Sequence, residues 1–168
     1  FYDLAVSGRV GKKPAEARPI SLTVGPVDIP AYLDRSGFVT RKSATELHLA
    51  DFDAWAEPLD QAMERVLLEN LHARLPLDPV ALYPPPDGIH TEYRLTVRVR
   101  RFDGALNGAC ELKADWSILG PDERLLVWRL GAFQGRDSGG TYASLAKAMS
   151  ELVTELSNAI ALELRQLA

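Results

Sequence analysis

Residues 93–118, YRLTVRVRRFDGALNGACELKADWSI, decide the fold. Residues 93–100 alternate apolar side chains with polar ones, mostly arginine, which is the two-residue period of a strand that buries one face. Residues 110–118 repeat this period, with acidic side chains on the polar face. Asp103-Gly104 and Asn107-Gly108 predict a turn region between the two segments. The stretch therefore predicts an antiparallel pair of strands in which the acids of the second lie opposite the arginines of the first.

A third strand is predicted directly after this pair. Residues 120–123, GPDE, have the composition of a turn, and the following residues 124–133, RLLVWRLGAF, are largely apolar on both faces. Apolar residues on both faces are expected of a strand that is covered on two sides. We therefore expect three antiparallel strands in the centre of a sheet.

Two segments have the apolar spacing of amphipathic helices. The first begins near Pro58, with Asp53 or Glu57 available to cap its free amides, and stops at Pro76. The second begins at Thr141 or Tyr142 and continues to the end of the chain. Their stripes are Leu59, Met63, Val66, Leu67, Leu71 and Leu75 in the first, and Leu145, Met149, Leu152, Val153, Leu156, Ile160 and Leu164 in the second. These elements predict an α/β fold of the α+β type, with a largely antiparallel or mixed sheet and two main helices packed on one face.

The N-terminal part is less regular. Residues 1–6 have the composition of a short strand, whereas residues 7–19 lack an apolar period and are predicted to be flexible. A strand begins at Ile20 and bends at Gly25-Pro26, and residues 38–50 have the pattern of a hairpin. With 168 residues and 46% hydrophobic composition, we expect a single domain over residues 1–168.

The overall charge argues against one class of partner. The net charge of −4, from 23 acidic and 19 basic residues, provides no basic field for nucleic acid. Cys110 is the single cysteine and is expected to be a buried apolar residue. Because Phe1 is not a start methionine, the chain is interpreted as a processed or trimmed product, and the lack of a signal peptide carries no information.

The sequence contains no convincing catalytic or metal-binding pattern. The run GRDSGG at residues 135–140 resembles a protease nucleophile motif around Ser138, but Arg136 interrupts it and no histidine lies in a matching context. A turn that caps the last helix is the preferred interpretation. His48, Asp51 and Asp53 alternate along an extended segment, so they are not expected to bind a metal. We therefore predict no enzyme activity, no catalytic residue, no metal and no cofactor.

The arginine row in residues 94–101 has two interpretations. Clustered guanidinium groups bind lipid headgroups or acidic partners. A solvated sheet face paired to Glu111 and Asp115 is the preferred interpretation.

Several short segments, taken together, resemble one family. They are VGPVDIPAYLDR at residues 24–35, VTR at 39–41 and LADFDAWAEPL at 49–59, and they occur in the order found in the ABC-type transport auxiliary lipoprotein family of the PqiC and YmbA type. In that family a segment of the form VGPV.LPAYLDR precedes a VTR strand and a helix start of the form W.EPL. The opening FYDL at residues 1–4 is similar to the YY.L that follows the lipidated cysteine of the family.

The resemblance implies a lipoprotein on the periplasmic side of the outer membrane, held there by an N-terminal lipid anchor that is absent from this chain. It also implies an MCE-domain protein and an inner-membrane transport subunit as partners, in lipid transport or membrane integrity. A scaffold of this kind is compatible with homo-oligomerisation, although no heptad or clear apolar patch in the sequence demonstrates it.

Two alternatives stay open for these segments. Shared residues such as Pro30, Gly37, Trp55 and Pro58 are explained by the requirements of the fold. A loop that binds the partner subunit is the functional interpretation, and its residues are Tyr32, Leu33, Asp34 and Arg35. For the whole chain, the alternative to a binding subunit is a periplasmic carrier in which the last helix and residues 125–130 enclose an apolar pocket for a lipid or another apolar ligand.

Overall fold

The structure is a computed structural model that describes residues 1–7 and 18–168. The predicted flexible segment 7–19 lies outside the described residues, apart from Ser7, Arg18 and Pro19. The elements are β1 (Ile20–Asp28), η1 (Ala31–Leu33), β2 (Gly37–Arg41), β3 (Leu47–Ala54), α1 (Leu59–Arg74), β4 (Leu77–Leu82), β5 (Tyr93–Gly104), β6 (Ala109–Leu119), η2 (Pro121–Glu123), β7 (Leu125–Arg136) and α2 (Tyr142–Leu167).

The strands of the described chain form one mixed sheet with β5 in its interior. β6 pairs with β5 and β7, both antiparallel, so β7 lies at one edge of the sheet. On the other side of β5, β1 pairs in parallel with β5 and with β4. Strand β2 pairs with one end of β5 and, antiparallel, with β3. The predicted mixed α+β fold is confirmed.

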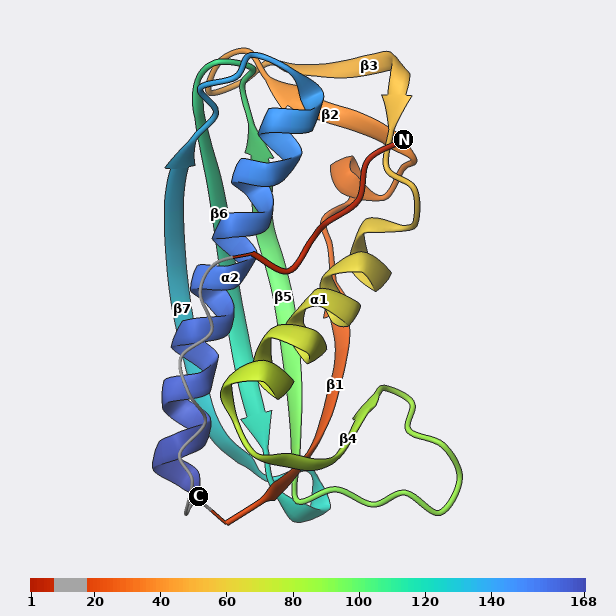
Figure 1. Cartoon of the computed structure of the whole chain (residues 1–168), viewed down its shortest axis with the longest axis vertical. Helices are drawn as coiled ribbons and strands as arrows, with labels where there is room; N and C mark the ends of the chain where they lie inside the picture. Colours follow the sequence, from red (N-terminus) through yellow and green to blue (C-terminus); the bar gives the residue numbers. More distant parts are fainter. Residues whose placement is uncertain (8–17) are drawn as a thin grey trace.

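The helices α1 and α2 lie side by side over one face of the sheet (Figure 1). Helix α2 begins with a capping box, in which the Thr141 hydroxyl accepts a hydrogen bond from the Ser144 amide and the Ser144 side chain accepts one from the Thr141 amide. The apolar stripes predicted for both helices are buried against the sheet, confirming these two predictions. The opposite face of the sheet is covered by neither helix.

The predicted antiparallel pair is β5 and β6. Arg98 lies opposite Asp115, and the inward side chains of both strands are buried. The prediction of a turn at Asp103-Gly104 was wrong, because β5 continues to Gly104. A register shift between Val99 and Arg101 alters the alternation, and the Asp103 side chain becomes fully buried.

Three smaller expectations also differ from the structure. Residues 1–6 do not form a strand; Tyr2 makes an isolated bridge to Trp55. Neither Asp53 nor Glu57 caps α1, because Asp53 accepts a hydrogen bond from Tyr2 and Glu57 binds Arg65. Strand β4 was not predicted.

Strand β7 differs most from its prediction. The sequence indicated a strand covered on both faces, but β7 pairs with β6 alone among the described strands and is largely exposed. The exposed large apolar side chains are Leu125 at 58%, Leu126 at 36%, Trp128 at 47% and Leu130 at 59%. The prediction of a strand covered on two sides was therefore wrong for the chain by itself.

Candidate functional site

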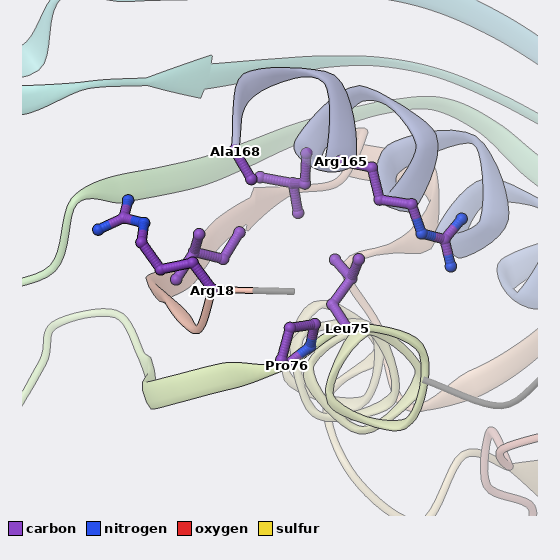
Figure 2. Close-up of a pocket in the computed structure, with 7 residues that line it drawn as sticks. Arg18, Leu75, Pro76, Arg165 and Ala168 are labelled. Atoms are coloured by element: carbon purple, nitrogen blue, oxygen red, sulfur yellow. The ribbon is translucent and has the colours of Figure 1, made fainter. Parts of the chain in front are cut away.

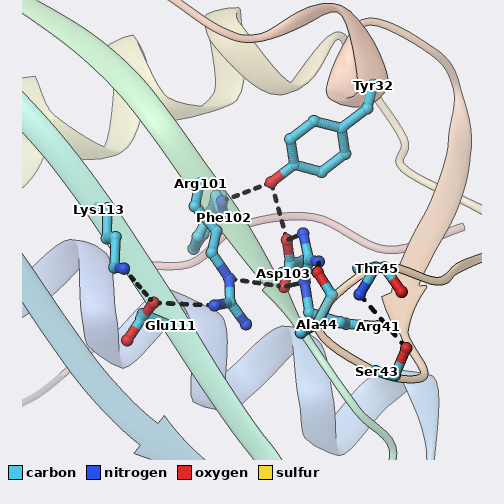
Figure 3. A network of polar contacts seen from close by, with 10 residues as sticks. All are labelled: Tyr32, Arg41, Ser43, Ala44, Thr45, Arg101, Phe102, Asp103, Glu111 and Lys113. Atoms are coloured by element: carbon cyan, nitrogen blue, oxygen red, sulfur yellow. Dashed lines mark hydrogen bonds and ion pairs between the residues drawn. The ribbon is translucent and has the colours of Figure 1, made fainter.

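A buried carboxylate, Asp103, is the centre of a polar network that joins four elements (Figure 3). Arg41 of β2 donates to both of its oxygens, at 2.8 Å from Nε and 2.9 Å from Nη2. The Tyr32 hydroxyl of η1 donates to Asp103 Oδ2 at 2.8 Å and accepts from the Phe102 amide at 3.0 Å. Arg101 bridges Asp103 and Glu111 of β6. The network therefore connects η1 and β2 to the interior of the sheet.

The charges in this network are stabilised by one another. Burial would raise the pKa of Asp103, but hydrogen bonds from Arg41 and Tyr32 and the charges of Arg101 and Arg41 outweigh burial and hold it below its ordinary value. Burial raises the pKa of Tyr32 to about 12. Among the described residues, strand β2 pairs with β5 only at Thr40 and Gly104. The Tyr32 and Arg41 side chains, through Asp103, therefore provide much of the attachment of the β2–β3 hairpin to the sheet.

The residues predicted to bind a partner divide into an inner and an outer pair. Tyr32 directs its hydroxyl into the network, and Leu33 is buried. Asp34 and Arg35 are exposed. They line a surface pocket of about 390 Å³ together with Phe1, Leu33, Ser36 and residues 55–59. Of the predicted four, Asp34 and Arg35 are the exposed side chains, while the buried Leu33 contributes to the wall of the same pocket and Tyr32 is half-buried.

A second pocket, of about 430 Å³, lies where the C-terminal ends of α1 and α2 meet the start of β1 (Figure 2). Its lining is mostly apolar, and the guanidinium groups of Arg18 and Arg165 point away from its centre. The apolar lining consists of Ile20, Leu75, Pro76, Leu164 and Ala168. The pocket differs in place from the one predicted beside residues 125–130.

Two arginines beside this pocket, Arg74 and Arg165, form no ion pair with a carboxylate within the described residues. Arg165 donates to the Arg74 carbonyl at 3.3 Å, and the buried Arg74 side chain binds Asn158 and the Asn70 carbonyl. Burial lowers the pKa of Arg74, and the charge of Arg165 lowers it further. Both arginines belong to the last turns of their helices, where the negative end of the helix dipole favours a cation.

The uncovered face of the sheet combines arginines with apolar residues. Asp115, 5% exposed, accepts hydrogen bonds from Arg100 Nε at 3.3 Å and Trp128 Nε1 at 3.0 Å, and Arg98 lies 3.8 Å away. This confirms the preferred interpretation of the arginine row, that it is paired with the acids of the next strand. The Trp128 indole is therefore joined to the same carboxylate as Arg100.

The geometry around Ser138 is that of a helix cap. Asp137 is buried and accepts hydrogen bonds from the amides of Asn107, Gly139 and Gly140 and from the Ser144 hydroxyl. These bonds organise the turn before α2, as expected from the sequence. Within residues 1–7 and 18–168, no group of three or more His, Cys, Asp or Glu side chains is arranged to hold a metal. No helix in the same ranges is long and apolar enough to span a membrane.

A family model for the ABC-type transport auxiliary lipoprotein component matches residues 2–161. The chain belongs to this family. It is 28% identical over 167 residues to the intermembrane transport lipoprotein PqiC of Escherichia coli K12 and to that of Shigella flexneri, covering 99% of this chain and 87% of each relative.

Solved structures with low sequence identity share the fold. A Xanthomonas campestris protein superposes with a TM-score of 0.74 at 21% identity, covering 91% of this chain and 89% of that one. PelC from Paraburkholderia phytofirmans, solved as a dodecamer, gives a TM-score of 0.51 at 12% identity, covering 88% of this chain and 89% of that one.

The segments that resemble the auxiliary lipoprotein family have clear roles in the fold. Tyr32 and Arg41 meet at Asp103, although 71 and 62 positions separate them from it in the chain. Trp55 stacks on Phe38 with ring centroids 4.5 Å apart, and Pro58 immediately precedes α1. The sequence pattern did not indicate that Asp103 is the centre of this network, because the Asp-Gly pair is also a common turn signal. The family segments thus position a hairpin and leave Asp34 and Arg35 at the surface.

Proposed function

We propose that this chain is a non-catalytic auxiliary lipoprotein of an MCE/ABC-type lipid-transport or membrane-integrity system. It is held on the periplasmic side of the outer membrane by an N-terminal lipid anchor and binds an MCE-domain protein and an inner-membrane transport subunit. Its family and its 28% identity to an intermembrane transport lipoprotein support this proposal.

The observation that carries partner binding is the pocket lined by Asp34, Arg35 and residues 55–59. It brings together two segments that resemble the family, and it is flanked by the exposed Phe1. An apolar wall with charged residues at its rim is typical of protein interfaces. The Tyr32–Asp103–Arg41 network fixes the loop that carries Asp34 and Arg35, so the pocket is preorganised for its partner.

The test is a binding titration with the purified MCE-domain protein. We expect Asp34→Ala/Arg35→Ala to weaken binding by about tenfold or more, because both charges are removed from the interface. The matched control is Asp87→Ala/Arg124→Ala, which removes exposed charges of the same two types elsewhere. No binding by the wild-type chain, or equal binding by both double variants, would overturn the proposal.

Carriage of a lipid is the second candidate function, supported by the apolar pocket of about 430 Å³ between the helix ends. The apolar lining fits an acyl chain, and Arg165, which forms no ion pair within the described residues, lies on its flank for an anionic headgroup. Native mass spectrometry of the protein purified from membranes is the test. A stoichiometric lipid that is lost in Leu164→Arg, with folding checked by circular dichroism, supports a carrier; a ligand-free protein rejects it.

The uncovered strand β7 supports association of this chain with copies of itself. A row of exposed apolar residues on an edge strand is a surface that proteins normally cover. PelC, which shares the fold, was solved as a dodecamer. Sedimentation of the lipidated full-length protein in detergent should show a species larger than a monomer, and a monomer at every concentration would reject self-association.

A further inference from the structure

Two surface features lie at different edges of the sheet: a shallow pocket with cations at its rim, and an exposed phenyl ring with acidic neighbours. The first is a shallow pocket of about 320 Å³ on the uncovered face of β5, β6 and β7. Leu130 and Ala132 form its apolar wall, and Arg100 and Lys113 stand at its rim, each with half of its side chain exposed. We call it the basic pocket.

The basic pocket has an excess of positive charge. Around it, five cationic side chains share three carboxylates in the ion pairs of the described chain. The cations are Arg41, Arg98, Arg100, Arg101 and Lys113, and the carboxylates are Asp103, Glu111 and Asp115. An apolar group accompanied by negative charge is therefore the ligand that this pocket suits.

The second feature is Phe52 on β3. Its side chain is 96% exposed, and it lies in a segment where the pairing of β2 with β3 shifts register. Asp51 and Asp53 flank it, and neither carboxylate forms an ion pair within residues 1–7 and 18–168. Asp53 accepts a hydrogen bond from the Tyr2 hydroxyl at 3.0 Å. Phe52 is thus an apolar knob accompanied by negative charge.

The knob and the basic pocket cannot meet within one chain. Strands β3 and β7 lie at opposite edges of the same sheet (Figure 1). We propose that Phe52 of one copy inserts into the basic pocket of the next, which brings the negative charge of Asp51 and Asp53 near Arg100 and Lys113. This proposal rests on the self-association proposed above and names its interface. Such a contact joins unlike surfaces, so it repeats head to tail and builds a ring or a filament.

A mixing experiment tests the interface on the full chain by sedimentation velocity. Phe52→Ala removes the knob, and Leu130→Asp blocks the basic pocket at an exposed position, so neither change disturbs the core. We expect each variant alone to be monomeric, because burial of one phenyl ring changes the association constant by about ten- to a hundredfold. Mixed together, they should form a dimer that does not grow, since one intact knob and one intact pocket remain.

Charge reversal and a matched truncation complete the test. Asp51→Lys and Lys113→Glu should each weaken assembly, and the double variant should recover part of it. Leu162→Ala, which trims an exposed apolar residue of α2, should assemble like the wild type. Wild-type oligomers that persist in Phe52→Ala would overturn this interface and leave self-association standing. A monomeric wild-type protein would overturn both.

Discussion

Removal of one hydroxyl, in Tyr32→Phe, tests whether the Asp103 network attaches the β2–β3 hairpin to the sheet. The change deletes the 2.8 Å hydrogen bond to a fully buried carboxylate and leaves the amide of the buried Phe102 without its 3.0 Å acceptor. A hydrogen bond to a charged group contributes about 1.5–3 kcal/mol, and a buried unpaired amide adds a further penalty. We therefore expect a loss of about 2–4 kcal/mol in the free energy of unfolding.

Urea unfolding followed by circular dichroism measures this loss. In a thermal scan, the melting temperature should fall by roughly 4–15 °C for a chain of this size. Tyr83→Phe is the matched control, since the Tyr83 ring is exposed and its hydroxyl makes no hydrogen bond in the described chain. A Tyr32→Phe protein within about 0.5 kcal/mol of the wild type would refute the reasoning, because ordinary surface changes fall in that range.

Three further predictions follow from the same packing. Because the pKa of Tyr32 is raised from 10.0 to about 12, its contribution to stability is full below pH 10 and is lost as the pH rises toward 12; urea titrations should show a larger loss in the wild type than in Tyr32→Phe. Burial raises the pKa of Cys110 to about 11, so a thiol reagent should label it only after denaturation. A Cβ on Gly104 would lie 2.5 Å from that of Cys110, so Gly104→Ala should lower the melting temperature, unlike Ala105→Ser in the adjoining turn.

The sequence predicted the local elements well because their periods are strong. The alternation in residues 93–118 and the stripe of the last helix have one interpretation each, and both are confirmed. Strand β4 was not predicted, because it follows Pro76, contains Pro79 and pairs in parallel with β1, which is more than 50 positions away in the chain. Its pairing is not a local property of the sequence.

Strand β7 and Asp103 show two further limits of sequence reasoning. Apolar residues on both faces of β7 indicate that the strand is covered, but an apolar pattern is the same whether a helix or another molecule covers it. Asp103 has the sequence context of a turn, and its role depends on Arg41 and Tyr32, which the fold brings to it. Of the predicted partner-binding residues, the pattern did not separate the exposed Asp34 and Arg35 from the half-buried Tyr32 and the buried Leu33.

Affinity purification of the full-length lipidated protein from its own membranes, with mass spectrometry of whatever accompanies it, tests the central claim most directly. We expect an MCE-domain protein to accompany the wild type and the Asp87→Ala/Arg124→Ala control, and to be lost with Asp34→Ala/Arg35→Ala. Recovery of no transport subunit with the wild type, or equal recovery with the Asp34→Ala/Arg35→Ala variant, would contradict the account.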